Sequence, residues 1–379
     1  MRLTPEQEAV RETVHELAVE EIRPVAAEAD ETETFPEGVW DRLGELDLLS
    51  LTIPEAYGGY DADGLTYAIV NEELAYGTLA VATAASVHML AASCIRNFGT
   101  EAHHEEYLTR MAEGRPVGMF CLSEPEAGSN PAGMSTVARK EGDEYVLNGK
   151  KQWITNGERG EIGVVFAKTD PDDPTSITQF LFEKSASGVE VGKKEQKLGL
   201  RASDTTTLMF DDVRIPAENR LTEEGRGLSA ALHSLTGGRV AIAAQAVGLA
   251  QSALDEATAY AQDREQFDQP ISEFQTIRHK LAEMATGTQA ARLLTYEAGR
   301  ELDTGSAPTR AASMAKLHAS QNAMEVTNEA IQIHGGYGYT TDFPVERMYR
   351  DAKITEIYEG TTEIQKKIIA REILGDGRR

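Results

Sequence analysis

The 379-residue sequence has only two cysteines, few aromatic side chains and far fewer basic than acidic residues. Cys94 and Cys121 lie in apolar neighbourhoods, without a CxxC pair or a disulfide framework, so we expect them to be small core residues in a reducing cytoplasm. No uninterrupted apolar run approaches membrane-spanning length, and the first residues lead into a helix without a signal peptide. We therefore expect a soluble cytoplasmic protein.

Acidic residues outnumber basic residues by 62 to 37, and the resulting formal net charge of -25 is spread along the chain. Arginine outnumbers lysine. These features predict a halophilic surface, built to stay soluble in high salt, and argue against nucleic acid or anionic lipid as partners. The adjacent His103 and His104 lack metal-ligand spacing and no other histidine cluster occurs, so we expect no metal site.

The pattern of apolar residues divides the chain into three parts. It is helical at first, alternates from about Gly118, and becomes helical again after Gly227. A chain of this length is expected to form two or three domains. We therefore predict an α+β protein with an all-α domain at 1–116, an antiparallel β domain at 117–223 and a second α domain, like a four-helix bundle, at 224–379.

Capping and breaking residues mark the expected helices. Thr4, Pro5 and Gln7 form a capping box with proline at the first helical position. Helices are expected at 5–29, 36–46, 65–98 with a break near Gly77, 101–111, 228–262, 271–303, 308–334, 344–352 and 363–374.

Runs rich in Val, Ile, Thr, Phe and Tyr mark the expected strands. They lie at 117–122, 136–140, 145–147, 152–155, 162–168, 177–182, 189–191 and 205–213. Asn148-Gly149 separates two of these runs and predicts a hairpin turn between them.

The stretch YEGTTEIQ at 358–365 precedes the last expected helix. Thr362 and Gln365 have the spacing of a capping box that opens this helix, which places Glu359 in the loop before it. The Glu359 carboxylate either complements the positive end of the helix dipole or acts as a base on a substrate proton. Taken alone, the octapeptide favours the first interpretation.

Trp153, Ile154 and Thr155 end one expected strand. Alternation places Trp153 and Thr155 on one face and Ile154 in the sheet core. A flat ring beside a hydroxyl suits a planar aromatic cofactor, although an ordinary half-buried strand has the same pattern. The stretch LSEPEAGSNP at 122–131 offers amide and hydroxyl donors for a phosphate or a cofactor rim, but it contains no GxSxG motif and no P-loop lysine.

Two more groups of polar and aromatic residues occur in the C-terminal third. The stretch QIHGGYGY at 332–339 follows a helix and lacks GxGxxG spacing, which excludes a Rossmann fingerprint and favours a helix C-terminal glycine turn. The second group surrounds Pro270 and consists of Arg264, Gln266, Phe267, Phe274 and Gln275.

In their order and on this α/β/α layout, five stretches resemble the acyl-CoA dehydrogenase family, and the resemblance covers essentially the whole chain. They lie at 122–130, 153–157, 264–274, 332–339 and 358–361. The resemblance implies an FAD enzyme of fatty acid β-oxidation, usually a homotetramer built as a dimer of dimers. It would introduce a trans-2,3 double bond into an acyl-CoA and pass electrons to an electron-transfer flavoprotein.

The resemblance also implies roles for individual residues. Glu359 would remove the α-proton while hydride leaves the β-carbon for flavin N5. The Thr155 hydroxyl would face N5, and Trp153 would cover the flavin ring. The neighbouring subunit would hold the adenosine half. The implied cofactor residues are Leu122, Ser123, Gly128, Ser129, Trp153, Ile154, Thr155, Arg264, Phe267, Phe274, Gln275, Gln332, Gly335, Gly336, Thr361 and Glu363, and the implied substrate residues are Ser129, Thr236, Gly238, Arg239 and Gly360.

One position separates branches of the family that this chain resembles. Some members carry the base immediately before the arginine that matches Arg239, where this chain has Gly238, so the base is expected to come from Glu359. This pattern resembles the short-chain and medium-chain branches, the short-chain branch most. Four residues depart from those usual in the family: Glu126, Asn130, Thr236 and Asp268.

Other functions remain open from the sequence. An acyl-CoA oxidase and a decarboxylating glutaryl-CoA relative would share these motifs, and a flavin-free interaction scaffold would share the fold. Acyl chain length is expected to depend on pocket depth near residues 87–95 and at the ends of the long C-terminal helices, because one methylene changes discrimination by only about 1 to 3 kcal/mol.

Overall fold

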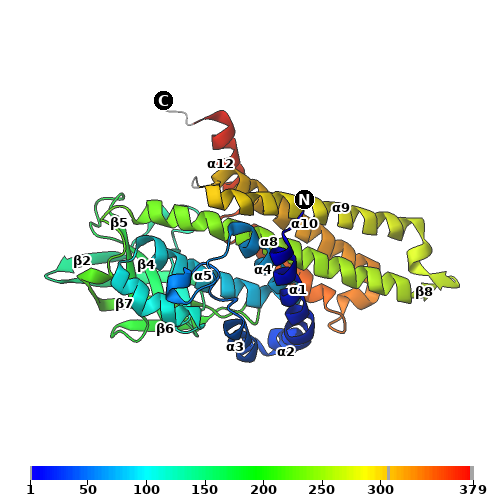
Figure 1. Cartoon of the computed structure of the whole chain (residues 1–379), viewed down its shortest axis with the longest axis horizontal. Helices are drawn as coiled ribbons and strands as arrows, with labels where there is room; N and C mark the ends of the chain where they lie inside the picture. The colour runs from blue at the N-terminus through cyan, green and yellow to red at the C-terminus, as the bar shows by residue number, and fades with distance from the viewer. Residues whose placement is uncertain (1, 305–307, 376–379) are drawn as a thin grey trace.

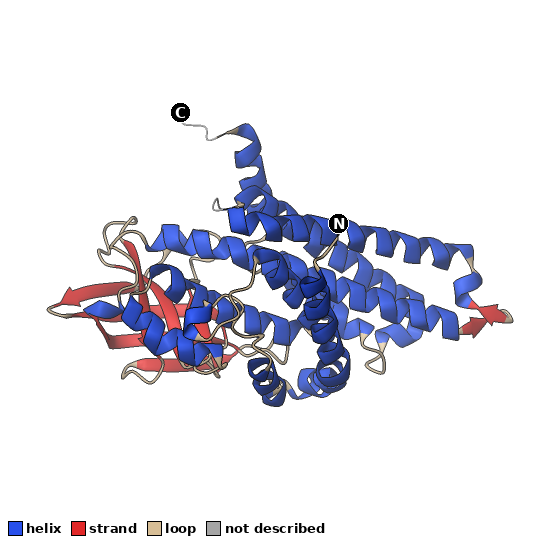
Figure 2. Cartoon of the chain, viewed as in Figure 1, coloured by secondary structure: helices blue, strands red, loops and turns tan. Residues whose placement is uncertain are grey.

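Three regions follow one another in the computed structural model, which describes residues 2–304 and 308–375: helices, a β-sheet and a second set of helices (Figures 1 and 2). This confirms the predicted fold class. Met1, 305–307 and 376–379, which belong to the first and third predicted domains, lie outside the described residues.

The first helix begins at the predicted capping box. The Thr4 hydroxyl accepts from the Gln7 backbone N–H at 3.2 Å, and the Gln7 side chain accepts from the Thr4 N–H at 3.1 Å. A π-helical turn at Ala18–Ile22 interrupts the expected continuous helix just before Pro24, which has no N–H to donate to the preceding turn. The helices of this region are α1 (Pro5–Leu17), α2 (Arg23–Thr32), α3 (Glu37–Glu45), α4 (Gly64–Gly77), α5 (Leu79–Phe98), α6 (Glu101–His103) and α7 (Thr109–Ala112).

Helix α5 corrects one expectation from the sequence. Its 20 residues are long and apolar enough to cross a membrane, although no such segment was expected. However, 83% of its most apolar window is buried inside the fold, as in the core helix of a soluble protein. It packs against the long helix α8 (Gly227–Asp263) and strand β1 (Gly118–Cys121), so it joins the helical and β regions.

The middle region is a seven-stranded sheet in the order β1-β4-β2-β3-β7-β6, with β5 paired to β4. It is mixed and not purely antiparallel, because β1 and β2 run parallel to β4. Its other strands are β2 (Val137–Glu141), β3 (Glu144–Thr155), β4 (Ile162–Lys168), β5 (Ile177–Glu183), β6 (Val189–Lys194) and β7 (Thr205–Pro216).

The predicted hairpin turn at Asn148-Gly149 is wrong, because both residues lie within the continuous strand β3. Here the register with β7 shifts, and the Asn148 amide exchanges hydrogen bonds of 2.9 and 3.0 Å with Asp212. Gly149 fits because a Cβ would lie 2.4 Å from Thr136 Oγ1. The Asn-Gly pair therefore marks a bulge, and the turn between β2 and β3 lies at Gly142.

Long helices form the third region, which shares a hydrophobic core with α1 to α5. α8 lies against α4, α9 and α10, and its many alanines allow this close packing. α9 begins four residues later than expected, after a short hairpin of β8 (Glu265–Gln266) and β9 (Gln269–Pro270) and a 3₁₀ turn at Ile271–Glu273. The remaining helices are α9 (Gln275–Glu301), α10 (Thr309–His334), α11 (Val345–Ala352) and α12 (Thr362–Leu374), which projects from the bundle (Figure 1).

Candidate active site

Glu359 lies in the loop before α12, as expected, but the cap of that helix differs from the prediction. Thr361 is the N-cap residue, and its hydroxyl accepts from the Ile364 N–H at 3.4 Å. Gln365 is buried and its amide donates to the Gly360 and Glu359 carbonyls at 2.8 and 3.3 Å. The predicted capping box at Thr362 is therefore wrong by one residue, and Gln365 supports the loop that carries Glu359.

The Glu359 carboxylate packs against the backbone of α8. A Cβ on Gly238 would lie 2.8 Å from Glu359 Oε2, so a larger residue there would occupy the same space. Part of Glu359 remains accessible to solvent, but Oε2 is enclosed and accepts no hydrogen bond from the described residues. This is an unusual environment for a carboxylate, and a helix dipole alone does not account for it.

Burial raises the pKa of the Glu359 carboxyl to about 7, while the charges of Arg239 and Lys316 oppose this rise. Arg239 is buried on α8, and its Nε lacks a hydrogen-bond partner among the described residues. Lys316 is buried on α10 and its Nζ donates to the carbonyls of Tyr358 and Gly360. Glu359 therefore combines the proton affinity of a base that works near neutral pH with two nearby cations.

Adjacent residues of α5 connect Glu359 to the end of strand β3. The Tyr358 hydroxyl lies 3.4 Å from the Thr83 hydroxyl and 3.4 Å from Gln245 Oε1. The next residue on α5, Ala84, accepts from the Asn156 amide at 3.0 Å. Because Asn156 directly follows Thr155 and Tyr358 directly precedes Glu359, these contacts bring the two candidate segments to one part of the molecule.

At the end of β3 the side chains alternate in burial. Trp153 is 60% exposed, Ile154 is buried and Thr155 is partly buried. Trp153 has a positive φ of 64°, and the pairing with β7 shifts register between Lys151 and Ile154. The irregular strand end thus presents a large ring to solvent, next to a hydroxyl-bearing residue.

The loop after β1 is anchored by a buried ion pair that the sequence reasoning missed. Lys151 Nζ lies 2.8 Å from Glu124 Oε1 and 3.2 Å from the Leu122 carbonyl, and both charged side chains are almost fully buried. Burial alone would raise the pKa of Glu124, but Lys151 and hydrogen bonds from Ser135 and Thr136 lower it to about 2. The pair holds the loop of 122–136 against the strand of Trp153.

The remaining candidates of this loop become more exposed along the chain. Ser123 is partly buried, Leu122 is buried, and Gly128 and Ser129 are exposed. Two of the departures from the family pattern, Glu126 and Asn130, are exposed as well. The predicted donors therefore lie on the surface of a loop with a rigid base.

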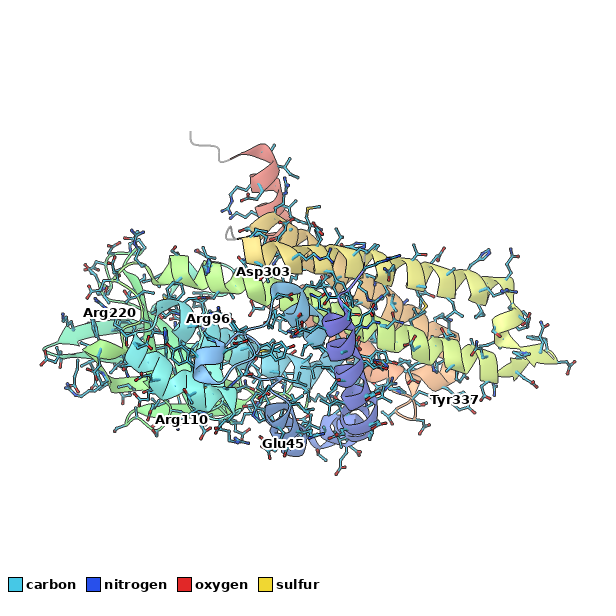
Figure 3. All side chains as sticks on the ribbon, viewed as in Figure 1. Glu45, Arg96, Arg110, Arg220, Asp303 and Tyr337 are labelled. Atoms are coloured by element: carbon cyan, nitrogen blue, oxygen red, sulfur yellow. The ribbon has the colours of Figure 1, made fainter. Side chains whose placement is uncertain are left out.

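The predicted cofactor residues around Pro270 and in the glycine turn after α10 lie toward the end of the molecule away from the β-sheet. The Arg264 guanidinium is 5.7 Å from the ring centre of Tyr337, and Phe267 contacts Phe274 edge to face. β8 and Tyr337 lie at one end of the long axis and the β-sheet at the other (Figures 1 and 3). Most residues of this region are exposed, Phe267 by 86%. The exposed residues also include Gln275, Gln332, Gly335, Gly336 and Asp268, which departs from the residue usual in the family.

The predicted substrate residues are divided between two of these places. Gly238, Arg239 and Gly360 surround Glu359, whereas Ser129 lies on the loop after β1. The Thr236 hydroxyl donates to the Leu232 carbonyl of its own helix at 3.2 Å, so it is turned toward the backbone of α8. Thr361 and Glu363 begin α12 beside the Glu359 loop.

Other reactive groups lie outside this arrangement. Cys94 and Cys121 are both buried as free thiols, and burial raises the pKa of each. Within residues 2–304 and 308–375, no group of three His, Cys, Asp or Glu side chains is placed to hold a metal ion.

Two residues that support the candidate site were missed because the sequence gives only indirect signs of them. Lys316 stands among the buried alanines of α10, so a charged residue on an apolar helical face was the available signal. Asn156 was noticed only as part of a motif, and its buried amide joins α5 to β1 by donating to the Ala84 and Gly118 carbonyls. Neither contact can be read from local spacing.

The fold and the site together define a protein of three regions, helical, β and helical, in which α5 connects the loop of an enclosed carboxylate to a strand end with an exposed aromatic ring. Models of the acyl-CoA dehydrogenase N-terminal, middle and C-terminal domains match residues 4–115, 119–213 and 225–374. The chain belongs to the acyl-CoA dehydrogenase family, and it is an FAD-dependent enzyme.

Individual relatives are similar over almost their whole length. The short-chain specific acyl-CoA dehydrogenase of Clostridium acetobutylicum is 46% identical over 98% of both chains. Butyryl-CoA dehydrogenase from Megasphaera elsdenii is 41% identical, with a TM-score of 0.96 over 99% of this chain and 100% of that one. A chain in a structure described as an electron transferring flavoprotein of Acidaminococcus fermentans is 41% identical, with a TM-score of 0.97 over 99% and 100%.

Proposed function

We propose that this enzyme converts a short-chain acyl-CoA thioester to the trans-2-enoyl-CoA, with Glu359 as the base that removes the α-proton. The observation that carries the proposal is the enclosed Glu359 carboxylate, with a pKa raised to about 7 by burial. A thioester α-proton is only weakly acidic, so its removal requires a positioned base of matched pKa. Short chains are supported by the relatives named short-chain specific and butyryl-CoA dehydrogenase.

The chain's own residues divide the work of proton removal. The Glu359 loop directs the carboxylate toward Gly238, where the absent side chain leaves room for the carboxylate itself. Backbone N–H groups at 359–360 are candidates to bind the thioester oxygen as negative charge develops on it. FAD, when bound, supplies the electron acceptor that takes hydride from the β-carbon at N5.

The exposed residues fit a flavin cofactor in their chemistry. Trp153 offers a ring face, and the loop of Ser123, Gly128 and Ser129 offers hydroxyl and backbone donors. At the other end, a Cβ on Gly335 or on Gly336 would meet nothing within 4 Å, so backbone there is open to a ligand. Trp153 and the loop of Ser123 to Ser129 would hold the flavin ring, with Thr361 and Glu363 beside it. The turn at Gly335 and Gly336 would hold the adenosine half.

The separation of these two groups supports an oligomer in which each cofactor site uses two chains. Phe267 follows β8 at one end of the chain, and Trp153 belongs to the β-sheet region at the other (Figure 1), which supports a cofactor held between two copies. A two-fold axis would bring each group of one copy to the other group of its partner. We assign this arrangement to a homotetramer built as a dimer of dimers.

Complementation tests the shared site. Trp153→Ala and Phe267→Asp should each abolish flavin binding when expressed alone. When the two variant chains are co-expressed, each mixed dimer has one site that carries both substitutions and one site that carries neither. Activity should then return to about a quarter of the wild-type value in a random mixture. No recovery in mixed oligomers, verified by differently tagged chains, would contradict a site built from two copies.

The electron acceptor assigned here is an electron-transfer flavoprotein, supported by the similar chain in the Acidaminococcus fermentans structure. Rapid oxidation of reduced enzyme by the flavoprotein, with little peroxide under oxygen, is expected. Fast peroxide formation would favour an oxidase. Release of carbon dioxide from glutaryl-CoA would favour the decarboxylating alternative, and a protein that cannot be loaded with FAD would favour a scaffold.

The proposed setting is fatty acid β-oxidation in the cytoplasm of a cell with high internal salt. It is supported by the formal net charge of -25 and by two buried free thiols. Retention of the fold and of activity in molar potassium chloride tests the salt assignment.

Glu359→Gln tests the assigned base. The variant should bind flavin and acyl-CoA normally and lose at least about 10³-fold in kcat, because an amide cannot accept the α-proton. Glu372→Gln, at an exposed glutamate further along α12, is the matched control and should keep wild-type turnover. Turnover within tenfold of wild type in Glu359→Gln would refute the assignment.

A further inference from the structure

Lys316 is a buried lysine whose ammonium group bonds only to backbone carbonyls among the described residues. It lies on α10 with only 1% of its surface exposed, on a face whose other buried residues are small: Ala312, Ser313, Ala315, Ala319 and Ser320. A buried ammonium costs free energy unless it is paired and hydrogen-bonded. Its partners therefore indicate why a lysine is present.

The two carbonyls that accept hydrogen bonds from Lys316 flank Glu359. Nζ donates to the Tyr358 carbonyl at 2.7 Å and also to the Gly360 carbonyl. The two residues between these contacts have positive φ angles, 52° for Glu359 and 93° for Gly360. A non-glycine residue in this conformation costs of order 1 kcal/mol or more and persists when neighbouring groups hold it.

A second anchor acts from another helix. Gln365 on α12 also donates to the Gly360 carbonyl, at 2.8 Å. Lys316 and Gln365 thus hold one carbonyl from two directions, while Tyr358 is fixed through its hydroxyl to α5 and α8. The loop is clamped on both sides of the carboxylate-bearing residue, and Lys316 is the charged member of the clamp.

The charges around Glu359 come from several helices. Arg239 on α8 and Lys316 on α10 are the cations, Tyr67 on α4 and Cys94 on α5 are neutral titratable groups, and Glu356 also faces Lys316. Burial lowers the pKa of Lys316 to about 8, against the opposing charge of Glu359. The ammonium is therefore largely present at neutral pH.

We propose that Lys316 is a positioning residue that locks the loop carrying Glu359 and keeps a cation beside its carboxylate. This inference rests on the proposed function of Glu359 as the base. Lys316 touches the loop backbone and acts on the reaction through Glu359. The same contacts serve two ends, since they fix the direction of the carboxylate and oppose the effect of burial on its proton affinity.

Lys316→Met removes the charge and both hydrogen bonds while keeping an unbranched side chain. We expect kcat to fall about 10²-fold from misplacement of the base, with KM changed less than about threefold. The apparent pKa in the kcat profile should rise by about one unit, because one of two cations is lost. Lys280→Met, which removes a lysine paired with Glu329 between α9 and α10, is the matched control.

A second readout does not depend on turnover. The thermal midpoint of the flavin-loaded, substrate-free enzyme is compared with that of its Glu359→Gln variant across pH, in wild-type and in Lys316→Met backgrounds. Without Lys316 the difference between the two midpoints should keep growing to a higher pH and level off at a larger value, because only the folded-state pKa of Glu359 rises. Lys316→Arg, which restores the cation, should return both profiles toward wild type.

An unchanged pH profile and kcat within threefold of wild type in Lys316→Met would overturn the role of Lys316. If Lys316→Met does not fold, the same test is made with Lys316→Gln. If neither neutral variant folds while Lys316→Arg folds normally, Lys316 has a structural role and the proposal is overturned. An active Glu359→Gln would instead refute the proposed base. The two failures are thus distinguishable.

Discussion

Glu359→Gln should stabilise the folded enzyme at alkaline pH, in addition to removing its activity. The reason is the environment of the carboxyl group, which burial shifts from its ordinary pKa of 4.5 to about 7, against the pull of Arg239 and Lys316. A neutral amide of the same size avoids the cost of placing a negative charge there.

The sign follows from proton binding. Between pH 4.5 and about 7 the folded chain keeps a proton on Glu359 that the unfolded chain has lost, so the free energy of unfolding falls as pH rises. Above about pH 7 both states are ionised and the loss is complete. Below pH 4.5 both states are protonated and the group contributes no such penalty.

The size of the effect follows from the same shift. A difference of about 2.5 units at about 1.36 kcal/mol per unit gives an upper value of about 3 kcal/mol, and solvent access to part of the side chain reduces it. With an unfolding entropy of roughly 2 cal/mol/K per residue, about 3 kcal/mol corresponds to roughly 4 °C in the midpoint of this 379-residue chain.

The assay is thermal unfolding of wild type and Glu359→Gln from pH 5 to pH 9, with flavin content matched. We expect similar midpoints at the acid end and a higher midpoint for the variant at the alkaline end. Glu363→Gln is the control with the opposite expectation, because hydrogen bonds from its own N–H and from Thr361 lower the pKa of Glu363. That variant should lose stability above the ordinary glutamate pKa.

A constant midpoint difference across the whole pH range would refute the reasoning. It would mean that Glu359 ionises in the folded chain as it does in the unfolded chain. The proposed matching of base strength to neutral pH would then lose its physical basis, whatever the activity of the variant.

Two other substitutions test the surroundings of the site. Gly238→Ala should lower kcat about 10²-fold, because its Cβ would lie 2.8 Å from Glu359 Oε2. Gly237→Ala, whose Cβ would meet nothing within 4 Å, should leave kcat within about threefold of wild type. Equal kcat in the two variants would contradict the packing of Glu359 against Gly238. Lys151→Met should lower the free energy of unfolding by about 3 to 5 kcal/mol in denaturant, because it leaves the Glu124 carboxylate buried without its counter-ion. Adding Glu124→Gln to the same chain should recover part of this lost stability. If the two substitutions instead lowered stability additively, the side chains would not be a coupled pair.

The sequence was sufficient to predict the region order and most helices, because their periodicity persists over many residues. Its local signals were less reliable where tertiary contacts competed with them. Asn148-Gly149 has strong hairpin chemistry, but pairing of β3 with β7 on both sides of it favours a bulge. At α12 both Thr361 and Thr362 could cap the helix, and the contacts of Gln365 with the loop favour Thr361.

The site shows a similar division. Glu359, Trp153 and Gly238 were expected from motifs that resemble a known family, and their environment could not be predicted from those motifs. Lys316, Asn156 and the Glu124 ion pair act through residues distant in sequence, so their meaning depends on which helices and strands lie side by side. A charged residue on the apolar face of a helix indicates that it has a partner, but only the tertiary structure shows which residue that partner is.

The surroundings of Glu359 explain why its base strength requires both burial and charge. Burial alone would favour the protonated carboxyl, which cannot accept a proton, while a directly bonded cation would stabilise the carboxylate and weaken it as a base. Lys316 instead bonds to the adjacent carbonyls, and Arg239 acts on Glu359 through its charge. Two cations placed this way limit the rise in pKa to about 7 and leave Oε2 without a donor. The carboxylate can therefore be charged near neutral pH and still have a lone pair available for the substrate proton.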